Sequence, residues 1–117
     1  MENQTMLFNS LNTKTSLDEI QDYVKKVLSI RGFDEETEKD IMLLMVEEVG
    51  ELAKSIRKQT GLKIDKNKLD SYSSVSEEIA DVFMYLVDLA NVLNINILEA
   101  FKGKEEKNIQ RVWEKSN

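Results

Sequence analysis

Hydrophobic residues recur along most of the chain three or four positions apart, which is the spacing of an α-helix, and no segment shows a convincing alternation of period two. The 117-residue sequence also contains no proline, the residue that breaks helices most strongly. This pattern predicts an all-α protein. A chain of this length can form one modest hydrophobic core, so we expect a single domain.

Capping residues mark where the first two long helices begin. The first is expected to open at Ser16, with its apolar side chains turned inward, and to end near Gly32. Asp34 is the expected N-cap of the second helix, which continues to the polar segment 58–73, where Gly61 is a stop signal. We expect that polar segment to be a loop or a frayed helix end.

Two further capping patterns follow, over residues 74–77 and 96–99. The first opens a long helix with a continuous apolar face, and the second opens a shorter helix, after which a basic tail runs over residues 102–115. Residues 1–15 are polar and without pattern, so we expect a flexible N-terminal arm. Residues 16–117 would then form one domain, a bundle of four to five helices.

The two central helices also carry apolar residues away from their main stripe. Leu43 and Val46 lie off the stripe on one helix, and Met84 and Val87 on the other. A single small bundle cannot cover such wide apolar arcs, so a second copy of the chain is expected to do so. We therefore expect a tight homodimer or homotetramer.

Composition narrows the possible functions. A net charge of −6 argues against binding to long nucleic acid, and the absence of histidine excludes His-based nucleophile activation and His-ligated zinc or di-iron sites. There is no cysteine for disulfides, no secretory signal and no apolar run long enough to span a membrane. We expect a cytoplasmic protein with no membrane partner, in which any metal is held by oxygen atoms.

Acidic residues interrupt the apolar stripes of the two central helices. Glu48 and Glu51 on one helix, and Glu78 and Asp81 on the other, each form a pair three residues apart at the edge of the apolar face. If these edges face each other, four carboxylates converge, and their repulsion requires protons or divalent cations to neutralise it. Oxygen-only ligands suit Mg²⁺ or Mn²⁺, whose coordination is often completed by phosphates.

Spacing alone leaves two interpretations of these acids about equally open. They form a metal site, or they are part of a solvated face, which is the usual role of a single helical glutamate. Glu47, Glu77 and Asp88 fit the solvated face more readily than the four paired acids do.

The order Glu47-Glu48-x-x-Glu51, then 26 intervening residues, then Glu78-x-x-Asp81, resembles the EExxE…ExxD signature of the MazG-like nucleoside triphosphate pyrophosphohydrolases. The resemblance covers roughly residues 17–113 and includes the sequence on both sides of each motif. It implies the all-α NTP pyrophosphatase fold, assembled as a dimer or tetramer. It also implies Mg²⁺ ligation by these four acids: Glu48, Glu51, Glu78 and Asp81.

The same resemblance implies residues for the triphosphate. A pattern like K-x3-N-x2-R after the last helix is matched by Lys104, Asn108 and Arg111, which without the acidic motifs would be an ordinary basic tail. Lys54, one turn after Glu51, is a weaker candidate. The sequence departs from many relatives at Asn91, where they have an acidic residue, and in the polar segment 58–73.

The implied activity is Mg²⁺-dependent cleavage of an NTP or dNTP to the nucleoside monophosphate and pyrophosphate, by attack of a metal-activated water on the α-phosphorus. Glu47 or Glu48 would accept the proton of that water. Tyr85 or Trp113 could stack on the base, although an aromatic residue at helical spacing is more often part of a core. Two other functions stay open: a non-catalytic helical interaction module with a solvated acidic face, and a cation-binding bundle without turnover.

Overall fold

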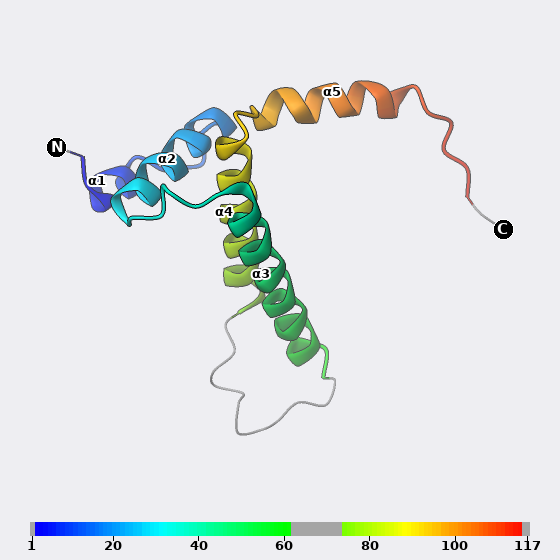
Figure 1. The fold of residues 1–117 in the computed structure, drawn as a ribbon. Coiled ribbons are helices and arrows are strands. Elements are labelled where there is room, and N and C mark those ends of the chain that lie inside the picture. The colour runs from blue at the N-terminus through cyan, green and yellow to red at the C-terminus, as the bar shows by residue number, and fades with distance from the viewer. Residues whose placement is uncertain (1, 62–73, 116–117) are drawn as a thin grey trace.

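The computed structural model describes residues 2–61 and 74–115, which form five α-helices (Figure 1). The all-α prediction is confirmed. The polar segment predicted after the second long helix lies mostly outside the described residues, in 62–73. In chain order the helices are α1 (Gln4–Asn9), α2 (Leu17–Ile30), α3 (Glu38–Gln59), α4 (Val75–Val92) and α5 (Ile97–Ile109).

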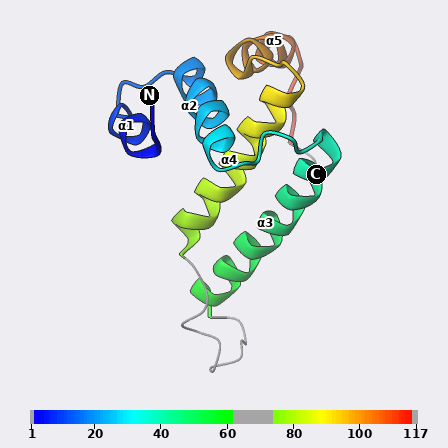
Figure 2. The same ribbon diagram turned by 60° about the vertical axis from the view of Figure 1, so that its left-hand side comes forward.

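The centre of the fold is an antiparallel pair, α3 and α4, which lie side by side along most of their length (Figures 1 and 2). α2 packs on α4, and α1 packs on α2. α5 leaves this group at the C-terminal end of α4 and contributes no buried residue. The single chain therefore has the five helices but leaves α5 extending away from the α3–α4 pair.

The start of α3 differs from the prediction. Thr37, not Asp34, is the N-cap: its Oγ1 accepts from the backbone N–H of Asp40 at 3.3 Å, and the Asp40 carboxylate accepts from the backbone N–H of Thr37 at 3.0 Å. Such a reciprocal pair satisfies two backbone donors at once. Asp34 cannot form one, because the residue three positions on is Thr37, which carries no carboxylate.

The other predicted boundaries of the long helices are confirmed. Ser16 and Glu19 form a reciprocal capping box at the start of α2, and the side chain of Ser74 accepts from the backbone N–H of Glu77 at the start of α4. α3 ends at Gln59, followed by Gly61 in the left-handed region at φ 81°. Glycine adopts that conformation without a steric penalty, so it stops the helix as predicted.

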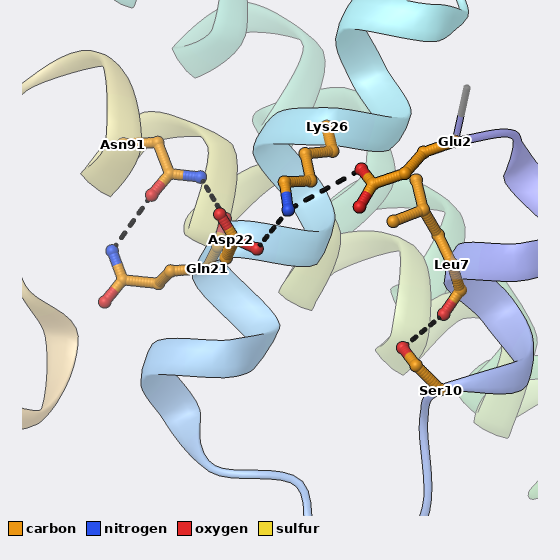
Figure 3. Close-up of polar contacts among 7 residues, drawn as sticks. All are labelled: Glu2, Leu7, Ser10, Gln21, Asp22, Lys26 and Asn91. Carbon is orange, nitrogen blue, oxygen red and sulfur yellow. Dashed lines mark hydrogen bonds and ion pairs between the residues drawn. The ribbon is translucent and has the colours of Figure 1, made fainter.

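Both ends of the chain contain more helix than predicted. α1 forms within the segment expected to be an arm, where Asn3 caps the helix and Leu7 is buried. Lys26 of α2 pairs with Asp22 at 3.0 Å and with Glu2, just before α1, at 3.6 Å (Figure 3). The flexibility expected of residues 1–15 stays a prediction. At the other end, α5 continues to Ile109, so most of the expected basic tail is helical.

The core of the single chain lies where α2, α3 and α4 meet. Val27, Ile41 and Val87 are fully enclosed there, so the expectation that Val87 faces a second subunit was wrong: α2 covers that side of α4. The main apolar stripe of α4 is instead substantially exposed at Ile79 and Leu86.

An amide network fixes α2 to the turn between α4 and α5. Gln21 Nε2 donates to Asn91 Oδ1 at 3.0 Å, and Asn91 Nδ2 donates to the backbone oxygen of Gln21 at 2.9 Å (Figure 3). Gln21 Oε1 accepts from the backbone N–H of Ile97, the first residue of α5, at 2.8 Å. One glutamine side chain thus holds the start of α5 against α2.

Within the described residues, no single helix is both long and apolar enough to cross a bilayer. α4 and α5 reach that length and composition only when taken together, across a bend of 95°.

The corrected start of α3 can be tested by removing each capping side chain in turn. Thr37→Ala is expected to lower the free energy of unfolding by about 1 kcal/mol, because the backbone N–H of Asp40 loses its acceptor. Asp34→Ala is the matched control and should change it by less than about 0.5 kcal/mol. Urea unfolding monitored by circular dichroism measures both, and a larger loss from the Asp34 variant would contradict the assignment.

Candidate active site

Three carboxylates from the central helix pair converge on one point. Glu48 comes from the middle of α3, and Glu78 and Asp81 come from the first turns of α4. Each offers one oxygen to a group whose atoms all lie within 4.8 Å of one another. Glu78 and Asp81 share a face of α4 because they are three residues apart, and the antiparallel packing brings Glu48 opposite them.

Burial makes this group electrostatically demanding. Glu78 is only 4% exposed, and Glu48 is half-buried. The pKa of Glu48 is raised, first by burial, next by a hydrogen bond with Glu78, and then by the charges of Asp81, Glu78 and Glu51. Like charges that must share a partly dry site favour a bound proton or cation.

The donor set fits a hard divalent cation. All three side chains offer carboxylate oxygen, which is the ligand type that Mg²⁺ and Mn²⁺ prefer. A cation at this point would neutralise the repulsion that raises the pKa of Glu48.

A cavity of about 330 Å³ adjoins the acidic group and shares two of its residues, Glu48 and Asp81. The cavity lies between the C-terminal part of α2 with the loop that follows it and the facing sides of α3 and α4. Its walls combine apolar and aromatic side chains with charged ones. They include Phe33, Leu44, Met84, Tyr85, Arg31 and Asp88.

Residues 36–113 match the model of the MazG nucleotide pyrophosphohydrolase domain, which covers more than half of the chain. The chain belongs to this MazG family. The resemblance drawn from the two acidic motifs is thereby confirmed. Glu48, Glu78 and Asp81 all lie within the matched range of this MazG domain.

A solved structure agrees with this membership, and one curated protein is similar over part of the chain. The crystal structure of iMazG from Vibrio DAT 722 matches 80% of this chain and 93% of its own, with a TM-score of 0.57 and 30% sequence identity. The uncharacterized protein YpjD of Bacillus subtilis (strain 168) is 43% identical over 60 residues. Those residues are 51% of this chain and 53% of YpjD, so the match spans about half of that relative.

The remaining acids predicted for the MazG site lie next to the three-residue group. Glu51 is exposed and pairs with Lys54 at 3.5 Å, and its charge reaches Glu48, whose pKa it helps to raise. Glu47 is exposed on α3. The roles predicted for Glu47, Glu51 and Lys54 stay predictions.

The residues predicted to hold the triphosphate lie elsewhere in the single chain. Lys104 and Asn108 are on α5, and Arg111 follows it, whereas the acidic group is at the opposite end of α4 from the start of α5. Arg111 lies over the ring of Trp113 at 5.9 Å, and the indole N–H of Trp113 donates to the backbone oxygen of Asn108. One chain alone does not bring this pattern to the acids.

Two aromatic residues considered for base stacking have different surroundings. Trp113 is 71% exposed, so it is not a core residue of the single chain. Tyr85 is half-buried and lines the cavity, and its pKa is raised by burial first and then by the charges of Glu48, Glu36, Asp81 and Asp88.

Asp88 was expected to belong to a solvated face, and that expectation was wrong. It is only 8% exposed and lines the cavity. Its pKa is raised, mainly by burial and then by the charge of Glu36. A signal was present in the sequence: seven residues separate Asp88 from Asp81, so the two lie almost on one line along α4. The packing of α2 over this position could not be foreseen from that spacing.

Glu48→Gln is expected to raise the Tm of the metal-free protein at neutral pH. Because the folded-state pKa of Glu48 lies above 4.5, its ordinary value, the folded chain binds this proton more tightly than the unfolded chain. The wild type therefore loses stability as the pH rises from 4.5 through the raised pKa, and glutamine removes that loss.

Thermal unfolding in the presence of a chelator, at about pH 3 and about pH 8, measures the difference between the two proteins. The advantage of the variant should be present at the higher pH and largely absent at the lower one. An equal difference at both values would show that Glu48 does not repel its neighbours in the folded state.

Proposed function

We propose that this MazG domain is a Mg²⁺-dependent nucleotide pyrophosphohydrolase, which cleaves an NTP or dNTP to the nucleoside monophosphate and pyrophosphate. The observation that carries the proposal is the convergence of Glu48, Glu78 and Asp81 within 4.8 Å, inside a matched MazG domain. The adjoining cavity has room for the remainder of a nucleotide beside that group.

Glu48, Glu78 and Asp81 would hold Mg²⁺ (or Mn²⁺), with Glu51 as a fourth ligand, one turn along α3 from Glu48. When bound, the ion supplies positive charge that neutralises the phosphates and makes water more acidic. The protein contributes the position of the acids, because the helix pair holds them together before substrate arrives. Such preorganisation is where an electrostatic site gains most of its effect.

Water attacks the α-phosphorus and pyrophosphate leaves, so the protein must accept one proton from that water. Glu47 or Glu48 is the proposed acceptor. Because water is the nucleophile, the reaction requires no nucleophilic side chain, which fits a chain without histidine or cysteine.

Lys104, Asn108 and Arg111 are proposed to contact the triphosphate, with Lys54 as a further candidate. Positive charge near the departing pyrophosphate matters most in the transition state, when that charge develops. Because α5 leads away from the acidic group of its own chain, this role requires a second copy of the chain.

A homodimer or homotetramer is therefore part of the proposal, and the exposed apolar surface supports it. Leu43 is 69% exposed on α3, Val46 is close to it, and Ile79 and Leu86 are exposed on the paired helix α4. Several large apolar side chains gathered on two neighbouring helices mark a surface that is normally covered. A cytoplasmic location stays a prediction.

The same exposed surface favours the alternative of a non-catalytic interaction module. It differs from the enzyme in one respect that can be measured directly: such a module, like a bundle that only binds cations, hydrolyses no nucleotide.

Purified protein with Mg²⁺ is expected to release pyrophosphate from at least one member of a panel of NTPs and dNTPs. Glu48→Gln and Asp81→Asn should lower this rate by roughly 100-fold or more, because loss of a cation ligand removes several kcal/mol of transition-state stabilisation. Glu77→Gln is the matched control, since Glu77 neighbours Glu78 but is exposed and outside the acidic group.

Mg²⁺ binding without substrate gives an independent reading. At about 100 times its dissociation constant, Mg²⁺ should stabilise the wild type by about 2.7 kcal/mol, and Asp81→Asn should abolish that gain. Absence of hydrolysis across the whole panel would contradict the proposed enzyme. Stabilisation by Mg²⁺ without any hydrolysis would indicate the cation-binding bundle.

Leu43→Glu is expected to break the proposed assembly, because a charge would have to be buried in an apolar interface. Ser29→Glu adds the same charge to an exposed position on α2 and should leave the assembly intact. Light scattering coupled to size-exclusion chromatography measures the mass of each. If the wild type is a monomer, α5 of a second copy cannot contribute to the site, and that part of the proposal is wrong.

A further inference from the structure

Asp88 is a mostly buried acid that the described residues leave without a hydrogen-bond partner. It is 8% exposed, and among the described residues none donates a hydrogen bond to its side chain or forms an ion pair with it. Because Asp88 lines a cavity, its carboxyl group can accept a hydrogen bond from water or from a ligand there. A ligand that brings a donor to this point would replace that water.

The distance of Asp88 from the acidic group indicates which part of a ligand would reach it. It lines the same cavity as Glu48 and Asp81, which belong to the acidic group. Seven residues of helix separate Asp81 from Asp88, which corresponds to about 10 Å along the axis of α4. A nucleotide with its phosphates at the acids would therefore extend its base toward Asp88.

The walls between these two points suit a flat heterocycle. Tyr85 lies one turn from Asp81 on α4, and Phe33 and Met84 also line the cavity. Aromatic and thioether side chains pack well against the faces of an aromatic ring, whereas a carboxylate can read only the hydrogen-bond donors on its edge.

We propose that Asp88 reads the edge of the nucleobase and selects bases that carry an exocyclic amine over uracil and thymine. This inference rests on the proposed function, because it requires the phosphates to sit at the acidic group. Cytosine presents an amine at C4, where uracil presents a carbonyl oxygen. The proposal places Asp88 against this exocyclic position, where a carboxylate accepts a hydrogen bond from the amine of cytosine and repels the oxygen of uracil. It does not place Asp88 against the ring N3–H, which is a donor that uracil also carries.

The test compares substrates that differ only in this group. For the wild-type protein with Mg²⁺, kcat/KM for pyrophosphate release should be at least about tenfold higher for dCTP than for dUTP. The same direction is expected for dATP against dITP, in which a carbonyl replaces the amine of adenine. The difference should appear mainly in KM, since Asp88 lies away from the reacting phosphorus.

Asp88→Asn offers a donor as well as an acceptor, so the dCTP to dUTP ratio should fall to about one or reverse. Asp88→Ala is a second variant that removes the acceptor and should also abolish the ratio. Glu38→Gln changes an exposed acid at the start of α3 that lines neither cavity bordered by Asp88, so it is the control and should keep the wild-type ratio. Circular dichroism confirms the fold of each.

Failure of this inference can be told from failure of the proposed function. If the wild type hydrolyses nucleotides but treats both members of each pair alike, Asp88 does not read the base, and the hydrolase stands. An unchanged ratio in the folded Asp88 variants leads to the same conclusion. If no nucleotide is hydrolysed, the proposed function and the base selection fall together. Should neither variant fold, the two wild-type pairs alone decide.

Discussion

The packing of α3 against α4 forces like charges together. Helices in antiparallel contact bring a fixed set of side chains opposite one another, and here that set includes Glu48, Glu78 and Asp81. Apolar contacts around them, with Ile41 and Val87 fully enclosed, supply the attraction that the acids oppose. Three carboxylates held this close together are a donor set that suits a hard divalent ion.

The distribution of polar and apolar side chains on α4 follows from the same packing. The buried residues of this helix include two acids, Glu78 and Asp88, while apolar Ile79 and Leu86 are substantially exposed. In a self-sufficient bundle the arrangement would be the reverse. Buried acids and exposed apolar residues on one helix are expected if its inner face binds a charged ligand and its outer face packs against another copy of the chain. The two features therefore support each other, although each stands on separate residues.

Helical class, most helix starts and the family were predictable because they depend on local signals. Capping at Ser16 and Ser74 needs only neighbouring residues, and the spacing of Glu78 and Asp81 fixes their common face. Asp34 failed as a cap because Thr37 competes for the same role and has a reciprocating partner in Asp40. The predictions that Val87 faces a second subunit and that Asp88 is solvated were wrong because the burial of both residues depends on α2, which is distant in sequence. The place of Lys104, Asn108 and Arg111 likewise depends on a direction of α5 that no local pattern specifies.

The side chain of Gln21 anchors only the first residue of α5, yet that helix runs on for 13 residues. At 1.5 Å per residue, α5 is a lever of about 20 Å, so a tilt of about 10° at its anchored base would move its far end by about 3 Å. Contacts at this base, from Gln21 to Ile97 and from the N-cap Asn96 to Asp18, thus govern where a distant basic side chain lies. A substitution at one of them would redirect the helix without changing any of its basic residues.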